Sequence, residues 1–305
     1  MSIKIFTDAA SNLFDYILKE KELDINVLPM TLQIGEESHL CYEENIDVEE
    51  FSKTLYEKLS KGEKAKTSLT SPGQFEKVFT DEVEKGNQVI FVCIASGISG
   101  NYQSSSLIAS QINEEHGKEL VKVIDAKTAS FGEGMVAMYA YKLAKEGKTF
   151  EEVVSLTEEY VKRVRSEFTV DNIKYLSNSG RVSSIVATIA GILSIKPLLY
   201  GSDEAKIEVS SKVHGRNNAI KTLAQQVVDH ITDKNSKVFI AHCNSLDDAN
   251  KLANLLRNNG INDIEIYYYD IVTGAHVGPG TLAVFYEGNN RTIEKKSLIK
   301  SIIGK

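Results

Sequence analysis

The stretch CIASGISGNYQSS, residues 93–105, decides the fold of this chain. A β-branched run, residues 89–92, leads into it, and a helical pattern of apolar residues, 107–112, follows it. A strand, a glycine-rich turn and a helix in this order form the unit from which parallel sheets flanked by helices are built. Ligands of such sheets lie at the carboxyl ends of the strands, so the turn also predicts where a site would lie.

The same alternation extends outward through the first half of the sequence. Short apolar runs predict strands, and amphipathic patterns between them predict helices. Capping signals support the helix starts at Ser71-Pro72 and at Thr149, the latter with Glu152 in a capping box. The expected strands are 4–7, 25–34, 89–95 and 120–124, and the expected helices are 12–20, 47–60, 72–84, 102–115, 132–146 and 150–166.

The second half predicts a different, smaller α/β unit. Its first part is expected to contain an extended segment, then an apolar helix rich in small residues, then a hairpin. Helices and strands are expected to alternate in the remainder. We place the boundary near residue 165, which gives an N-terminal α/β domain, 1–165, and a C-terminal α/β domain, 166–305. The expected segments are extended 168–176, helix 183–195, hairpin strands 198–200 and 206–212, helices 215–233 and 246–259, and strands 238–241, 264–271 and 282–286.

Composition narrows the classes of function. The chain has 305 residues and a formal charge of −7, which argues against electrostatic binding to nucleic acid or to anionic membranes. Its longest apolar stretch, 185–195, is too short to span a bilayer. The N-terminus enters a strand at once, so we expect no signal peptide and a cytoplasmic protein. Three scattered cysteines without metal-binding spacing predict a reduced chain without a metal site.

Three loops rich in hydroxyl groups and glycine, 67–72, 96–100 and 128–134, are expected at helix starts, where free N–H groups favour an anion. The order of residues in a P-loop and the dinucleotide pattern G-x-G-x-x-G are both missing. None of these loops contains arginine or lysine, whereas a phosphate dianion usually recruits cationic side chains. The loops therefore favour a carboxylate ligand; the alternative is that they are ordinary capped helix starts and tight turns.

Two residues leave an enzymatic alternative open. Gly97-Ile98-Ser99 begins like the nucleophile elbow G-x-S-x-G, although Asn101 replaces its last glycine. His276 lies in the segment 273–280, which we expect to be a loop because of its three glycines. A histidine there can donate a hydrogen bond to a carboxylate, or it can activate a serine.

Seven motifs in order resemble the DegV family of bacterial fatty-acid-binding proteins, over nearly the whole chain. The chain departs from the family pattern at Ala9, at Asn178-Ser179 and at Asn101. The motifs are TSLTSP (67–72), ASGISGNYQS (95–104), IDAKTASFGEG (124–134), KYLSNSGRV (174–182), IKPLL (195–199), HGRNNAI (214–220) and GAHVGPG (274–280).

The resemblance implies two α/β domains with one long-chain fatty acid, such as palmitate, in a tunnel between them. It implies that Thr67, Ser99 and His276 bind the carboxylate and that Arg181 and Arg216 lie toward the exposed face near the head group. We expect a supporting role for neighbouring loop residues: Ser68, Thr70, Gly97, Gly100 and Ser130. The apolar segment 184–195 is a candidate tunnel wall.

The resemblance also implies a non-catalytic protein without a cofactor. Such a protein hands its bound acid to an ATP-dependent, DAK-like fatty acid kinase subunit, which makes an acyl phosphate for phospholipid synthesis. Two alternatives stay open. One is a Ser–His hydrolase that acts on acyl esters through Ser99 and His276, with Asp125 or Asp270 as its acid. The other is a sugar or dihydroxyacetone phosphotransfer module.

Overall fold

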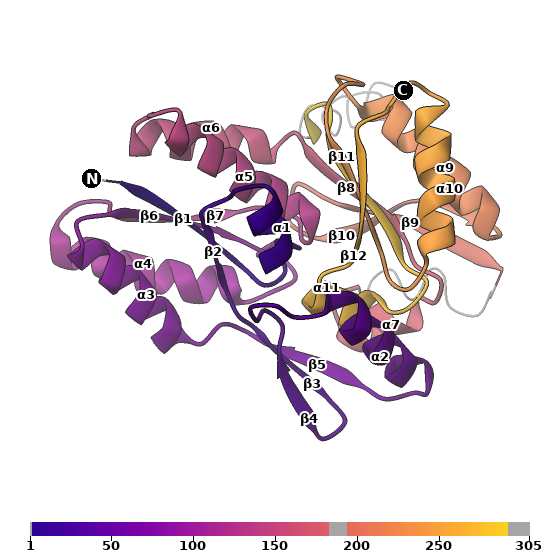
Figure 1. The fold of residues 1–305 in the computed structure, drawn as a ribbon, viewed down its shortest axis with the longest axis horizontal. Helices are drawn as coiled ribbons and strands as arrows, with labels where there is room; N and C mark the ends of the chain where they lie inside the picture. The colour runs from indigo at the N-terminus through magenta and orange to yellow at the C-terminus, as the bar shows by residue number, and fades with distance from the viewer. Residues whose placement is uncertain (1, 183–193, 292–305) are drawn as a thin grey trace, which may run out of the picture.

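The computed structural model describes residues 2–182 and 194–291. The first half is built on a parallel sheet in the order β2-β1-β6-β7 (Figure 1). Helices α3 and α4 pack together on one face of it, and α5 and α6 on the other. The bounds are β1 Ile3–Asp8, α1 Asp15–Glu20, β2 Ile25–Leu28, α3 Pro72–Glu84, β6 Gln88–Cys93, α4 Asn101–His116, β7 Val121–Asp125, α5 Phe131–Lys145 and α6 Phe150–Val161.

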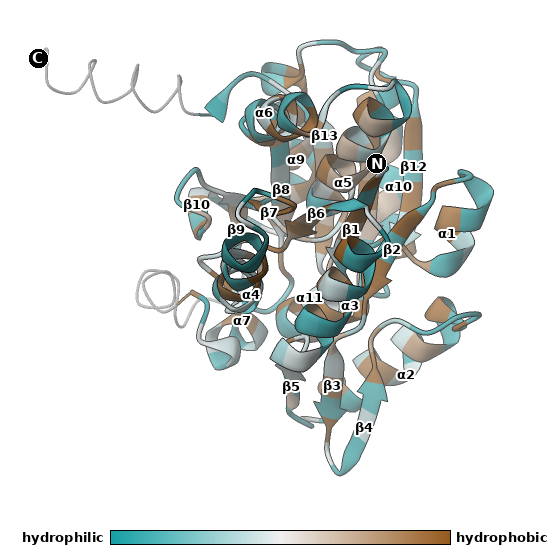
Figure 2. Cartoon of the chain, turned by 90° about the vertical axis from the view of Figure 1, so that its left-hand side faces the viewer, coloured by the Kyte–Doolittle hydropathy of each residue, from teal (hydrophilic) through white to brown (hydrophobic). Residues whose placement is uncertain are grey.

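The helix starts follow from the residues that cap them. The Ser71 hydroxyl accepts from the N–H of Gln74, and Thr149 and Glu152 form a complete capping box at α6. These side chains satisfy backbone donors that have no partner inside the helix. In Figure 2 the apolar residues gather on β1 and β6, whereas α3 and α4 carry hydrophilic residues on their outer faces.

A small antiparallel sheet, in the order β4-β3-β5, lies beside the parallel one. The expected strand 25–34 was wrong as a single element: its two halves, β2 and β3, belong to different sheets. Pro29 separates them, because proline lacks the N–H that a continuous strand would donate. The bounds are β3 Thr31–Ile34, β4 Glu37–Leu40, α2 Val48–Ser60 and β5 Ala65–Ser68.

The second half is a six-stranded sheet in the order β10-β9-β8-β13-β11-β12. β11 and β12 pair in parallel, and the other pairs are antiparallel. The two-unit α/β fold class predicted from the sequence is confirmed. The bounds are β8 Val164–Thr169, α7 Lys174–Ser179, β9 Ile195–Gly201, β10 Ile207–His214, α9 Arg216–His230, β11 Val238–His242, α10 Leu246–Arg257, β12 Ile264–Tyr268, α11 Ile271–Val277 and β13 Leu282–Glu287.

Three expectations for the second half were wrong. The extended segment 168–176 ends with β8 at Thr169, and α7 follows it. The strand 264–271 ends at Tyr268. The glycine-rich segment 273–280 is not a loop throughout, because its first five residues form most of α11. The Asp270 carboxylate accepts from the N–H of Thr273, and this cap starts the helix despite Gly274. The expected helix 183–195 falls on residues outside those described, 183–193, apart from its last two.

The two halves share one hydrophobic core. α5 packs against strands of both sheets, and the Phe131 ring at its start stacks on Phe239 of β11 with centroids 4.6 Å apart. A second cluster joins α9 and α10 to the far face of the six-stranded sheet. The shared core holds the carboxyl ends of β1 and β6 against the second half. The domain boundary near residue 165 stays a prediction.

Candidate functional site

A hydrogen bond joins the two halves at the predicted site. Oγ1 of Thr67, near the end of β5, lies 2.7 Å from Nε2 of His276 in α11. The pair is partly buried and is separated by 209 positions in sequence. β5 and α11 are neighbours in the fold, so two motifs from opposite ends of the sequence meet here.

Ser99 lies in the tight turn between β6 and α4. The carbonyl of Ala95 accepts from the N–H groups of Ile98 and Ser99, and Oγ of Ser99 accepts from the N–H of Asn101 at 3.3 Å. A Cβ on Gly97 would lie 2.3 Å from the carbonyl oxygen of Ala205 in the second half. Glycine at this position therefore lets the turn approach the facing backbone.

Thr67, Ser99 and His276 line one cavity, which we call the head chamber. Ser179 and Arg181 contribute further polar groups to its wall. The remaining lining residues, apart from Thr273, are apolar: Met30, Leu69, Ile94, Ile98, Leu176, Ile207, Val272 and Val277. The chamber thus combines a few converging polar groups with an apolar lining, as ligand sites commonly do.

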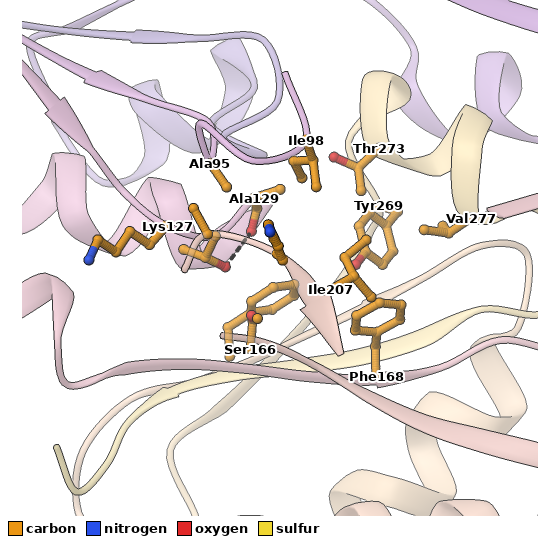
Figure 3. A pocket seen from close by; sticks show the side chains of 15 residues that line it. Ala95, Ile98, Lys127, Ala129, Ser166, Phe168, Ile207, Tyr269, Thr273 and Val277 are labelled. Atoms are coloured by element: carbon orange, nitrogen blue, oxygen red, sulfur yellow. Dashed lines mark hydrogen bonds between the residues drawn. The ribbon is translucent and has the colours of Figure 1, made fainter. Parts of the chain in front are cut away.

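A second cavity, the distal chamber, adjoins the first between the two halves (Figure 3). The two chambers have four lining residues in common, Ile98, Ile207, Thr273 and Val277. Most of the residues that line the distal chamber have apolar side chains. Its other lining residues are Ala95, Lys127, Thr128, Ala129, Ser166, Phe168, Gly201, Ala205, Lys206, Tyr269 and Phe285. The two chambers therefore adjoin each other, and Thr67, Ser99 and His276 line only the head chamber.

The His276 imidazole is neutral at physiological pH. Its burial lowers the pKa to about 4, and the positive charge of nearby Arg181 acts in the same direction. A neutral ring carries one N–H and one acceptor nitrogen, so it can donate one hydrogen bond without bringing a charge. Among the described residues that line the head chamber, Arg181 is therefore the one that carries a positive charge.

The DegV family model, described as "Uncharacterised protein, DegV family", matches residues 2–289. This chain belongs to the DegV family. A DegV domain-containing protein of Clostridium perfringens is 35% identical to it over 289 residues, which cover 94% of this chain and 98% of the relative.

Solved DegV structures share the fold. The fatty acid binding DegV family protein of Streptococcus agalactiae is 28% identical with a TM-score of 0.81, covering 95% of this chain and 100% of that one. The Fatty Acid Kinase (Fak) B3 protein of Streptococcus pneumoniae, loaded with linoleic acid, is 20% identical with a TM-score of 0.78 and the same coverage. The second likeness shows the fold alone.

The two arginines predicted for this DegV chain lie in different places. Arg181 is exposed at the head chamber, where its Nε donates to the carbonyl of Ile98 and its Nη1 to that of Ser179. Arg216, at the start of α9, lines neither chamber. It forms an ion pair with Asp248 at 2.8 Å.

None of the five expected supporting residues lines the head chamber. Ser68 is exposed on β5, and Thr70 donates to the carbonyl of Pro29. The Ser130 hydroxyl donates to Asn12 at 2.9 Å. Gly97 and Gly100 instead let the turn that contains Ser99 pack closely against other segments. An added Cβ would lie 2.3 Å from the carbonyl oxygen of Ala205 at Gly97, and 3.3 Å from Leu69 at Gly100.

Sequence reasoning missed Asn101 as a functional residue. Its side chain is buried at the start of α4, where Nδ2 donates to Asp8 at 3.0 Å and Oδ1 accepts from the N–H of Thr70 at 3.2 Å. Its own N–H donates to Ser99. It therefore connects β1, the segment after β5 and the serine turn. The one signal in the sequence was its departure from the family pattern.

The geometry does not assemble a hydrolase triad. His276 Nε2 contacts Thr67, and the Ser99 hydroxyl accepts from Asn101. Of the two candidate acids, Asp125 accepts from Ser96 and from the N–H of Lys127, and Asp270 caps α11. Neither carboxylate is placed to orient the imidazole, which a triad requires.

Within residues 2–182 and 194–291, no helix has both the length and the apolar character needed to cross a bilayer. No group of three or more His, Cys, Asp or Glu side chains there is arranged to hold a metal ion.

Proposed function

We propose that this protein binds a long-chain fatty acid, with the carboxylate in the head chamber and the acyl chain in the distal chamber. The observation that carries the proposal is that the two chambers adjoin, since four residues line both. Each buried methylene contributes about 0.8 kcal/mol, so the apolar chamber supplies most of the affinity. The fatty acid bound by the Streptococcus agalactiae relative supports the same ligand class.

The carboxylate is recognised by uncharged donors. When Nε2 of neutral His276 carries the proton, it donates to Thr67 Oγ1, and the Thr67 hydroxyl is then free to donate to the ligand. Ser99 supplies a second hydroxyl. Charge-assisted hydrogen bonds of this kind are strong, yet they leave lone pairs of the carboxylate accessible.

We further propose that the protein presents this carboxylate to an ATP-dependent fatty acid kinase, which forms an acyl phosphate for phospholipid synthesis. The exposed Arg181 guanidinium beside the head chamber supports the proposal, because it can pair with a phosphate oxygen of the donor. The name of the Streptococcus pneumoniae Fak B3 protein points to the same partner class. We propose Arg216 as a more distant partner contact.

The ligand proposal is tested by extracting lipid from purified protein and identifying it by mass spectrometry. We expect one long-chain fatty acid per chain, and we expect delipidated protein to rebind it. Protein that carries no fatty acid and binds none on addition would contradict the proposal. Covalent labelling of Ser99 by a fluorophosphonate would favour the hydrolase instead.

The partner proposal is tested with a fatty acid kinase from the same organism. Arg181→Ala and Arg216→Ala, loaded with equal amounts of fatty acid, should each slow acyl phosphate formation. Lys221→Ala, on the same helix as Arg216, is the matched control. Unchanged turnover in both arginine variants would rule out this face as the kinase contact.

A further inference from the structure

Besides Thr273, whose hydroxyl oxygen is fully enclosed by protein, the distal chamber contains two hydroxyl groups that a purely hydrocarbon chain would leave without a partner. Ser166 of β8 and Tyr269, which follows β12, both line it, and their side chains are labelled in Figure 3. These residues are 8% and 3% exposed. Within residues 2–182 and 194–291, neither hydroxyl forms a hydrogen bond to the protein. Neither oxygen is fully enclosed, so both hydroxyls lack a protein partner in the described part of the chain and still reach open space.

This arrangement becomes costly once a hydrocarbon chain fills the cavity and displaces water. A hydroxyl that is then left without a partner is destabilising, and buried tyrosines usually find a hydrogen-bonding partner. Burial raises the pKa of Tyr269 far above its ordinary value, so the phenol keeps its proton and can donate. Phe168 and Phe285 line the same chamber and offer no polar group in return.

The surrounding backbone holds both hydroxyls in place. Tyr269 donates its N–H to the carbonyl of His242, and the next residue, Asp270, donates its N–H to Asn12. A Cβ on Gly201 would lie 2.7 Å from Oγ of Ser166 and 3.4 Å from the carbonyl oxygen of Lys127. Glycine at 201 thus keeps a side chain away from the serine oxygen.

We propose that the distal chamber binds an acyl chain that carries a neutral oxygen substituent, namely a hydroxy fatty acid, through Ser166 and Tyr269. This inference rests on the proposed fatty acid function and specifies the ligand within it. A hydroxyl group both donates and accepts, so it can pair with each protein hydroxyl.

A second carboxylate at the far end is the competing ligand chemistry. It would place a charge against aromatic rings, and burial without a partner strongly disfavours a charge. The amine of Lys127 extends away from the cavity in Figure 3, and Lys206 is exposed. The distal chamber therefore favours a neutral substituent.

The test compares dissociation constants of octadecanoic acid, a positional series of its monohydroxy derivatives, and the corresponding α,ω-dicarboxylic acid. Each is measured by displacement of a fluorescent fatty acid from delipidated protein. The proteins are wild type, Ser166→Ala, Tyr269→Phe and the double variant. Tyr160→Phe is the control, because Tyr160 is similarly buried and lines neither chamber.

We expect at least one hydroxy isomer to lose affinity relative to octadecanoic acid by about 3–10-fold in each single variant, as for loss of one hydrogen bond. Octadecanoic acid itself should bind the double variant at least as tightly as wild type. If every isomer keeps its wild-type ratio to octadecanoic acid in all variants, the inference is overturned. Preferred binding of the dicarboxylic acid would also overturn it. Failure of every acid to bind wild type would instead contradict the proposed function.

Discussion

The hydroxyls of Thr67 and Ser99 come from different elements but line the same chamber, and their roles can be separated by ligand chemistry. A hydroxyl that donates to the carboxylate matters for a fatty acid and much less for its methyl ester, which lacks the charge. This contrast distinguishes recognition of the head group from general packing of the chamber.

We predict that Ser99→Ala weakens binding of a fatty acid by about 10-fold, as expected for one charge-assisted hydrogen bond. Binding of the methyl ester should change by less than 2-fold. Displacement titrations with both ligands measure this. Equal losses for the two ligands would contradict the assignment of Ser99 to the carboxylate.

Asn101 is predicted to act as a positioning residue, because it bonds to Asp8 and to the N–H of Thr70 while its own N–H bonds to Ser99. Asn101→Ala should weaken fatty acid binding more than ester binding, although Asn101 lines neither chamber. Gln103→Ala, on the exposed side of α4, is the control. An equal loss for acid and ester would indicate a general structural role instead.

The lowered pKa of His276 predicts a pH dependence of stability. Its value is about 4 in the folded chain against an ordinary 6.5, so between these pH values the unfolded chain binds more protons. Stability is therefore lost as the pH falls from 6.5 toward 4, by at most about 3 kcal/mol from this residue.

His276→Gln removes this contribution. Urea unfolding of both delipidated proteins between pH 4.5 and 7 should show the wild type losing stability relative to the variant on acidification. His242 and Asp270 also have shifted pKa values, but both proteins contain them, so their effects cancel in the difference. If the free energy of unfolding of the two proteins changes equally with pH, the burial of His276 does not contribute to the pH dependence of stability.

At the scale of elements, Gly97 controls how closely the serine turn approaches the second half. Gly97→Ala should destabilise the protein by about 2 kcal/mol or more, because its Cβ would lie 2.3 Å from the carbonyl oxygen of Ala205. Fatty acid affinity should fall with it. Thermal unfolding and ligand titration measure the two effects.

Gly73→Ala is the matched control for this prediction. Gly73 lies in the first turn of α3 with no atom within 4 Å of an added Cβ, and alanine has a higher helix propensity. This variant should be as stable as wild type or slightly more stable. A similar loss in both variants would attribute the effect to glycine replacement in general.

The sequence predicted correctly those helix starts that depend on a single capping residue. Ser71 and Thr149 start α3 and α6 as expected, because capping is a contact over three positions. The glycine-rich segment before Gly278 was misassigned, since its helix depends on the Asp270 cap and on packing against β5 and α2. Tertiary contacts outweighed local propensity there.

Motifs likewise predicted the residues of the head chamber but not their connections. Thr67, Ser99 and His276 line one cavity, and their binding of a carboxylate stays a prediction. The connecting role of Asn101 could not be recognised from the sequence. Its hydrogen-bond partners lie up to 93 positions away from it and become its neighbours only in the fold. The distal hydroxyls of Ser166 and Tyr269 were missed for the same reason.

At the scale of the whole molecule, ligand binding should raise stability because the chambers form between the halves. A ligand at 100 times its dissociation constant adds about 2.7 kcal/mol, which corresponds to several degrees in Tm. Thermal unfolding of delipidated protein with increasing fatty acid measures the effect. A Tm that stays constant while ligand binds would place the ligand outside the interface between the halves.

The bond between Thr67 and His276 also constrains events during synthesis on the ribosome. Threonine leaves the exit tunnel 209 residues ahead of its histidine partner. A nascent polypeptide therefore has no finished polar pocket until nearly all of it has been translated. If the proposed site binds the fatty acid, we therefore expect loading to follow the emergence of His276 rather than to begin on the N-terminal portion.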